Sequence, residues 1–350
     1  MAKAHSPLSL YLASAYTLLA IYGSLYPFDW HDTGVSLTAF LFADWPRYTT
    51  SFDIASNVVA YVPLGFLWAT VLQSRLAPMI AVVAAAAIGA TLSLTMEVGQ
   101  HFVPSRVPSN LDFACNAAGA LIGALAGAEW GRTMLDGGQL DALRKRLFLP
   151  GAGADAGLLL IWLWILTQLN PDTLLFGNGG LRELLDIPAP LPYSAEGFAR
   201  IEAAIVAADV FAIALIVTLL SRRWRADLPL MVLGAGLLAK SSAFLIMMGG
   251  RAGLAWATPG SLSGLAIGLV LWFLATPLQA RWQRAVAALS LLLATTLVNI
   301  APENPYLANT FQIWNPGQFL NFHGLTRLAS NLWPFLALPW LILLRTDHER

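Results

Sequence analysis

Apolar stretches long enough to cross a membrane recur along the whole chain and limit it to one class of fold. Each is about 17 to 25 residues long, the length a helix needs to cross a hydrocarbon core of roughly 30 Å. The residue alternation of a membrane β-barrel is absent, so helices must satisfy the backbone polar groups in lipid. We therefore predict an all-α, polytopic membrane protein. About ten transmembrane helices are expected, at residues 8–26, 54–73, 78–101, 111–130, 154–170, 199–220, 229–248, 258–276, 282–300 and 327–345.

Composition and charge agree with this class and exclude others. Hydrophobic residues make up 57% of the 350 residues and charged residues only 11%, with a mean hydropathy of +0.64, outside the usual soluble range. A formal net charge of zero leaves no basic surface for nucleic acid, so we expect no nucleic-acid partner. The single cysteine, Cys115, is expected to be a small apolar residue of the fourth helix.

The distribution of basic residues predicts the orientation. Cytoplasmic loops retain Lys and Arg, whereas translocated loops carry few. With the N-terminus inside, most of the 20 basic residues fall in predicted cytoplasmic loops. The first apolar stretch continues into Tyr26-Pro27 without a persuasive cleavage site, so we interpret it as a helix and not as a signal peptide. We therefore expect a multi-pass protein of the cell (inner) membrane with both termini in the cytoplasm.

The longest predicted cytoplasmic connection divides the chain. It contains paired glycines and the basic run Arg144-Lys145-Arg146, a composition typical of a linker between helical bundles. No strict internal repeat is visible. We predict a four-helix membrane domain at residues 1–130, a cytoplasmic linker at 131–153 and a six-helix membrane domain at 154–350.

Polar side chains gather near one membrane boundary in the first predicted domain. They lie at the start of the second helix, at the end of the third, in the loop that follows and at the start of the fourth. Spacings of three and four residues put the members of each set on one helix face, so we expect all of them to converge at the outer boundary. The candidate ligand-binding residues are Asp53, Asn57, Glu97, Gln100, His101, Arg106, Asp112 and Asn116.

Two interpretations of this cluster are open. A charged group costs about 2.5 to 3.5 kcal/mol at the centre of a membrane helix and less near the surface. In an architectural interpretation, Arg106 pairs with Glu97 or Asp112 to hold the loop, and the asparagines are interhelical hydrogen-bond partners. In a functional interpretation the cluster is a polar pocket, because ionisable groups inside a membrane are functional candidates by default.

The order and spacing of these residues resemble the VanZ-like family. The resemblance covers roughly residues 10–130 and implies a four-helix membrane domain. Founding members of the family are associated with resistance to teicoplanin-type lipoglycopeptides, but fold-level analogy supplies no defined reaction. The six later helices resemble no family that we recognise. The matching elements are Tyr26-Pro27-Phe28, Asp53-(x)3-Asn57, Val62-Pro63-Leu64-Gly65-Phe66, Glu97-Val98-Gly99-Gln100, Arg106 and Asp112-(x)3-Asn116-(x)2-Gly119-(x)3-Gly123.

Binding of a lipid-linked molecule suits the predicted pocket. We expect Arg106 to contact an anionic or amide-rich headgroup, while carboxylates and amides supply directional hydrogen bonds. Candidate partners are membrane lipids, a lipid-linked cell-wall precursor and a lipoglycopeptide antibiotic, and the expected effect is on envelope properties or antibiotic susceptibility. An intramembrane enzyme acting on a lipid-linked phosphate or sugar is an alternative, although no nucleophile stands out. No cofactor or metal is predicted, since the HExxH motif is absent and a single histidine lies among scattered acids.

A second polar pair lies in the later helices. Asp209 and Lys240 fall at matching depths, about 12 to 14 Å from the outer ends of their helices, which predicts an intramembrane ion pair. The pair is either a static bridge or part of a proton or ion relay. Together with Gly260, Gly264 and Gly268, it suits a membrane transporter or permease, the other alternative to a binding role; a discontinuous helix would support that function, and none is visible.

Glycines of the fourth helix predict close helix packing. Gly119, Gly123 and Gly127 recur every four residues, and such a stripe lets a neighbouring helix approach closely in lipid. Pro63 predicts a kink in the second helix.

Overall fold

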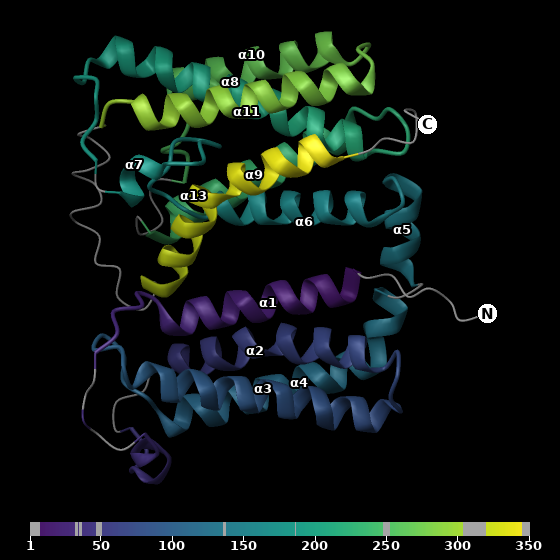
Figure 1. Cartoon of the computed structure of the whole chain (residues 1–350), viewed down its shortest axis with the longest axis vertical. Helices are drawn as coiled ribbons and strands as arrows, with labels where there is room; N and C mark the ends of the chain where they lie inside the picture. The colour runs from purple at the N-terminus through teal and green to yellow at the C-terminus, as the bar shows by residue number, and fades with distance from the viewer. Residues whose placement is uncertain are drawn as a thin grey trace. The chain divides into compact units, whose positions relative to one another are not determined.

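The computed structural model describes residues 8–31, 34, 37–46, 51–135, 138–185, 187–247, 253–303 and 320–344. Over these residues the chain is helical and contains no β-strand. It forms two compact units, residues 1–146 and 147–350 (Figure 1). The boundary between them falls within the predicted linker, where residues Gln139–Leu147 form the short helix α5.

Unit 1 is built from four long helices. α1 begins the unit, and Tyr16 Oη donates to Ala60 O of α2 (2.8 Å), while Trp68 Nε1 of α2 donates to Thr17 Oγ1 (3.0 Å). α2 continues through Pro63. A short 3-10 helix, η1 (Ala39–Phe42), lies in the α1–α2 connection. The bounds of the long helices are α1 Leu8–Leu25, α2 Ser51–Leu72, α3 Pro78–Gln100 and α4 Asn110–Met134.

Glycines bring the backbones of α2 and α4 into contact. A Cβ added at Gly119 would lie 2.2 Å from Val58 O, and one at Gly123 would lie 1.9 Å from Val62 O. Gly127 repeats the contact one turn further along. Any side chain at these positions would force the helices apart, so the predicted small-residue stripe is confirmed as a packing feature. Since the contacts advance in the same direction on both helices, α2 and α4 are parallel and begin at the same end of the unit.

Unit 2 is arranged around α8, most of which is buried. α10 packs on it through a second glycine stripe: a Cβ at Gly264 would lie 2.6 Å from Ala203 O, and one at Gly268 would lie 2.7 Å from Ala207 O. The helices of this unit are α6 (Ala152–Thr167), α7 (Leu181–Leu184), α8 (Ala195–Leu220), α9 (Asp227–Met247), α10 (Pro259–Ala275), α11 (Ala280–Ile300) and α13 (Leu320–Leu343).

A non-helical segment follows α6 and runs through the interior of unit 2. We call residues 168–180 the buried segment, because most of its residues are buried. The Phe176 ring packs on Trp164 with centroids 5.0 Å apart, and a Cβ at Gly236 of α9 would collide with both rings. The fifth predicted helix, residues 154–170, therefore ends earlier than expected as an α-helix, at Thr167. Turn bonds follow at residues 168–170, and the chain then continues as non-helical backbone.

Six described helices are long and apolar enough to cross a membrane, and three shorter apolar helices accompany them. This is the helical content of a multi-pass membrane protein. Every one of the ten predicted ranges contains a helix, although residues 248 and 345 lie outside the described residues. The total of ten spans and the orientation stay predictions. The six are residues 53–72, 78–100, 110–134, 195–220, 227–245 and 280–300; the three are 9–25, 152–167 and 259–275.

Candidate functional site

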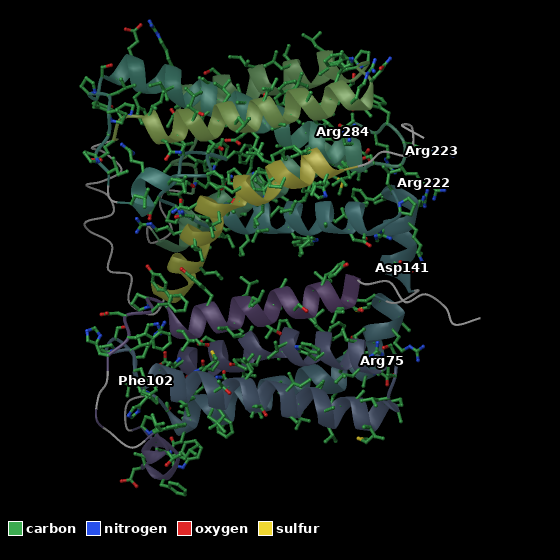
Figure 2. The ribbon with its side chains drawn as sticks, viewed as in Figure 1. Arg75, Phe102, Asp141, Arg222, Arg223 and Arg284 are labelled. Carbon is green, nitrogen blue, oxygen red and sulfur yellow. The ribbon has the colours of Figure 1, made fainter. Side chains whose placement is uncertain are left out.

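The predicted site residues lie at one end of unit 1, where α1 and α3 end and α2 and α4 begin. We call this the polar end. Phe102, which directly follows α3, marks it in Figure 2, and Arg75 lies at the opposite end of the unit. Gln100 Nε2 donates to Ser24 O of α1 (3.0 Å), which ties the ends of α1 and α3 together.

Two carboxylates stand at the starts of the two parallel helices. Asp53 lies in the first turn of α2 and Asp112 in the first turn of α4, where the positive end of a helix dipole favours negative charge. Asn57 Nδ2 donates to Asp112 Oδ1 across the helices (2.9 Å). Asp53 lies near enough to Asp112 for their charges to interact, and all three residues are only half-buried. The packing of α2 on α4 thus places two partly exposed acidic groups within electrostatic range of each other.

Glu97 connects α3 to the start of α4. Its side chain is 2% exposed, and Oε2 accepts a hydrogen bond from the backbone N–H of Ser109 (2.8 Å). Ser109 caps α4, since its Oγ accepts from the N–H of Asp112 (3.3 Å), as is usual for a serine N-cap. We call Asn57, Asp112, Ser109 and Glu97 the three-helix network.

Deeper in the bundle, Asn116 Nδ2 donates to Ser93 Oγ (3.0 Å), and both residues are buried. This bond lies one turn below Asp112 and joins α4 to α3, as expected for an interhelical asparagine.

Tyr61 belongs to the same region and was not predicted. It is 4% exposed, and its hydroxyl lies close to Ser93, Ser24 and Glu97 without a well-aligned hydrogen-bond partner among the described residues. The signal was its spacing of four residues from Asn57, which places both on one face of α2. Ser109 was also missed as a functional partner, although a serine directly before an apolar run is a typical helix cap.

Arg106 holds the end of α1. Its Nε and Nη2 donate to Tyr26 O (3.3 and 3.0 Å), and Nη2 also donates to Gly23 O (3.3 Å). Burial lowers the pKa of Arg106, and the negative charge of Glu97 opposes that shift. The hydrogen-bonded pair of Arg106 with Glu97 or Asp112 is therefore not formed, because the last carbonyls of α1 lack helical partners and accept the guanidinium donors. We call Arg106 and Gln100 the α1 clamp.

The structure thus brings all eight predicted residues to the polar end but divides their tasks. The α1 clamp binds backbone carbonyls, while the three-helix network joins side chains to one another. His101 follows α3, is half-buried and packs edge-on against Phe102 with ring centroids 6.1 Å apart. Among the described residues, no group of three or more His, Cys, Asp or Glu could hold a metal ion.

The predicted Asp209–Lys240 ion pair is not formed. Lys240 is fully buried, and its Nζ donates to Asn170 O (2.7 Å), Thr173 O (2.6 Å) and Thr173 Oγ1 (3.1 Å). The physical reason is the early end of α6, because carbonyls of the buried segment have no helical partner and match the three donors of an ammonium group. Asp209 is 1% exposed, and its Oδ2 has no hydrogen-bond partner within the described part of the chain.

Comparison with known proteins agrees with this division into units. No curated protein and no solved structure gives a significant match. Residues 10–128 match the family model described as VanZ/LLP1. The matched range contains most of α1 and α4 and all of α2 and α3, and it stops before α5 and unit 2. The N-terminal region of this chain is therefore VanZ-like.

Proposed function

We propose that the polar end of unit 1 binds the headgroup of a lipid-linked or lipidated cell-envelope molecule at the outer face of the cell membrane. Binding would affect envelope properties or susceptibility to lipoglycopeptides such as teicoplanin. Membrane lipids, a lipid-linked cell-wall precursor and the lipoglycopeptide itself are the candidate partners. The VanZ-like match of residues 10–128 supports this role, and the chemistry of the site refines it.

The observation that carries the proposal is the half-buried carboxylate pair, Asp53 and Asp112. Like charges placed together disfavour folding, while each of the two acids also complements the dipole of its own helix. Grouping both acids with buried Glu97 suits a ligand that donates hydrogen bonds. Hydroxyl, amide N–H and amine groups of sugars and peptides have this chemistry. The ligand would therefore meet the acids, and the three-helix network would position Asp112 and Glu97.

The proposed orientation is ten transmembrane helices with both termini inside, which puts the polar end outside. Arg75 lies at the other end of unit 1, away from Phe102 (Figure 2). A basic residue at that end is in keeping with a cytoplasmic position. Labelling of the Arg106→Cys variant tests this orientation. We expect an impermeant thiol reagent to label residue 106 in intact cells. Labelling only after lysis would contradict the orientation.

Ligand binding can be tested with the purified full-length protein. Native mass spectrometry should detect a co-purifying lipid or lipid-linked molecule, and Asp112→Asn should lose it. The asparagine oxygen can still accept from Asn57, so the fold is kept while the charge is removed. Glu129→Gln is the matched control, because Glu129 is exposed on the same helix near its other end. Equal occupancy in Asp112→Asn and the control would contradict the proposal.

The cellular test uses Glu97→Gln, Arg106→Ala and Asp112→Asn. Each should abolish the change in teicoplanin susceptibility or envelope integrity that the wild type confers, at nearly normal membrane abundance. In Glu97→Gln the glutamine oxygen can still accept a hydrogen bond from the Ser109 N–H. A lost phenotype in this variant would therefore result from the loss of the negative charge. Parallel loss of abundance in all three variants would instead support a purely architectural cluster.

A transporter is the second candidate, favoured by the buried segment of unit 2. Non-helical backbone at membrane depth is typical of transporter binding sites. Flux of the bound molecule into proteoliposomes would distinguish transport from binding, since a binder retains the ligand without moving it across.

A further inference from the structure

The buried segment has irregular backbone in the interior of a helical unit, which is unusual in a membrane protein. α6 has 16 residues, about 24 Å of helix, less than the roughly 30 Å of a hydrocarbon core. The chain then makes three i→i−3 turn bonds at residues 168–170 and continues as non-helical backbone to residue 180. Such backbone occurs at membrane depth only where protein buries it or where it lines a polar cavity.

Neighbouring helices hold this segment by its backbone. Gly179 is the centre of the arrangement: its N–H donates to Ser330 O of α13 (2.8 Å), and its carbonyl accepts from Asn299 Nδ2 of α11 (2.7 Å). Asn299 Oδ1 in turn accepts from the N–H of Arg182 (2.8 Å), and Ser330 Oγ accepts from Asn170 Nδ2 (2.9 Å). The backbone of the segment is therefore satisfied around Gly179.

The side chains around Gly179 are not satisfied in the same way. Asn178 Oδ1, Thr295 Oγ1 and Asn331 Nδ2 are buried without a hydrogen-bond partner among the described residues, and their residues are 2%, 9% and 1% exposed. Thr295 Oγ1 lies 3.3 Å from the position of a Cβ on Gly179. Asn178 and Asn331 are the chain neighbours of Gly179 and of its partner Ser330. Arg182 Nη1, three residues further on, is likewise buried and without a partner.

Buried polar groups in folded proteins almost always have partners. Four unpaired atoms on residues that adjoin Gly179 or its hydrogen-bond partners therefore point to a missing partner in this region. Its chemistry follows from the atoms. Asn331 Nδ2 and Arg182 Nη1 can only donate, the Thr295 hydroxyl can donate, and Asn178 Oδ1 can only accept. The amide nitrogen of Asn178 already donates to Phe176 O (2.7 Å). Donors are in the majority, and one of them carries a positive charge.

We propose that unit 2 contains a binding site beside Gly179 for an oxyanion, a phosphate or a carboxylate, on a molecule that also presents one hydrogen-bond donor. Arg182, Thr295 and Asn331 donate to the anion, and Asn178 accepts from the neighbouring donor. Lys240 does not contact the anion, since its ammonium is held by the carbonyls of Asn170 and Thr173. The site is separate from the polar end of unit 1 and stands or falls independently of the function proposed there.

Thr295→Val distinguishes a binding site from ordinary structure. Removing a hydroxyl that has no protein partner should raise the thermal unfolding midpoint of the full-length, ligand-free protein. It should also weaken the binding of inorganic phosphate or acetate, measured by calorimetry in detergent, by about tenfold or more. Thr218→Val is the control. Its hydroxyl accepts from Trp272 Nε1 (3.0 Å) and donates to Ala214 O (2.8 Å), so this variant should lower the midpoint and leave anion affinity unchanged.

Arg182→Gln provides a second test, with the largest expected loss of anion affinity. The source of the anion follows from comparing phosphate in detergent with nanodiscs of phosphatidylglycerol or phosphatidylcholine. Saturable stabilisation by phosphate supports a free solute, and stabilisation by phosphatidylglycerol alone supports a lipid headgroup. The proposal is overturned if no probe binds, if Arg182→Gln and Thr295→Val bind as tightly as the wild type, or if Thr295→Val lowers the midpoint as the control does, because an internal water would then be the missing partner.

Discussion

Each unit contains a helix that ends before a proline, and in each a buried or half-buried cation holds the chain at that point. In unit 1, Arg106 donates to the carbonyl of Tyr26, directly before Pro27. In unit 2, Lys240 donates to the carbonyl of Asn170, directly before Pro171. A helix that stops leaves carbonyls without partners, and a cation from elsewhere in the unit satisfies them.

The two arrangements differ in depth and in their neighbours. Arg106 comes from a loop and is half-buried, and the half-buried carboxylates Asp53 and Asp112 lie at the same end of unit 1. Lys240 comes from the middle of α9 and is fully buried, beside a segment most of whose residues are buried. Carbonyls at a helix end need donors in both units. In unit 1 they are satisfied at an accessible polar surface, and in unit 2 they are satisfied inside the helix bundle.

The glycine stripes of the two units differ in tightness, and this difference should produce the largest effects. Gly123→Ala should destabilise unit 1 by more than about 3 kcal/mol, because its Cβ would lie 1.9 Å from a carbonyl that cannot move alone. Gly264→Ala should cost unit 2 less, since its nearest contact is 2.6 Å. Unfolding titrations with sodium dodecyl sulfate measure both. A larger effect at Gly264 would contradict the ranking.

Removal of the deeper cation should have the next largest effect. Lys240→Met removes the ammonium donor from the carbonyls of Asn170 and Thr173, at a cost of about 2 to 4 kcal/mol in unfolding free energy. In the double variant with Asp209→Asn, the change in unfolding free energy should equal the sum of the two single changes to within about 0.5 kcal/mol. Residues without shared partners behave independently. A coupling energy above about 1 kcal/mol in this double-mutant cycle would show that Asp209 and Lys240 interact, contrary to the structure.

Removal of the shallower cation should cost less. Arg106→Met is expected to destabilise unit 1 by about 1 to 2 kcal/mol, since water can reach the carbonyls of Gly23 and Tyr26 when the guanidinium is absent. Hydrogen exchange should show increased opening at the end of α1, with α2 and α4 unchanged. Exchange that rises equally throughout unit 1 would mean that Arg106 supports the whole unit and not only α1.

The smallest effect on stability is expected at the carboxylate pair. Asp112→Asn removes one of two neighbouring negative charges and keeps the bond from Asn57, so the unfolding free energy should change by less than about 1 kcal/mol. If the loss exceeds 2 kcal/mol, the acids serve the fold, and the contrast between an accessible site in unit 1 and a closed one in unit 2 disappears.

Hydropathy located the helices well because a long apolar run has few alternatives in lipid. The range 78–101 became α3 at Pro78–Gln100, and 199–220 became α8 at Ala195–Leu220. Spacing within helices also placed the polar residues together, since positions three and four apart share a face. Convergence of Asp112 with Asn57 and of Glu97 with the loop after α3 followed from that rule.

The partners of the two cations could not be predicted in the same way. Spacing says nothing about backbone carbonyls, and Arg106 and Lys240 bind carbonyls that become available only where a helix stops. The end of α6 at Thr167 was hidden because Leu169 follows the last apolar residue, Leu166, at helical spacing. The matching depths of Asp209 and Lys240 then suggested that the two form an ion pair. The actual acceptors of Lys240, the carbonyls of Asn170 and Thr173, lie at and beyond the end of the predicted helix and were not considered.

The glycine contacts between α2 and α4 also limit how those helices can move. The contacts recur every four residues on both helices, so α4 fits against α2 only at positions about 6 Å apart. A smaller slide would press a Cα against a carbonyl oxygen. Asp53 and Asp112, at the starts of these helices, are therefore held at a constant separation, and under the proposed function a ligand would be selected by whether its donor groups match that separation.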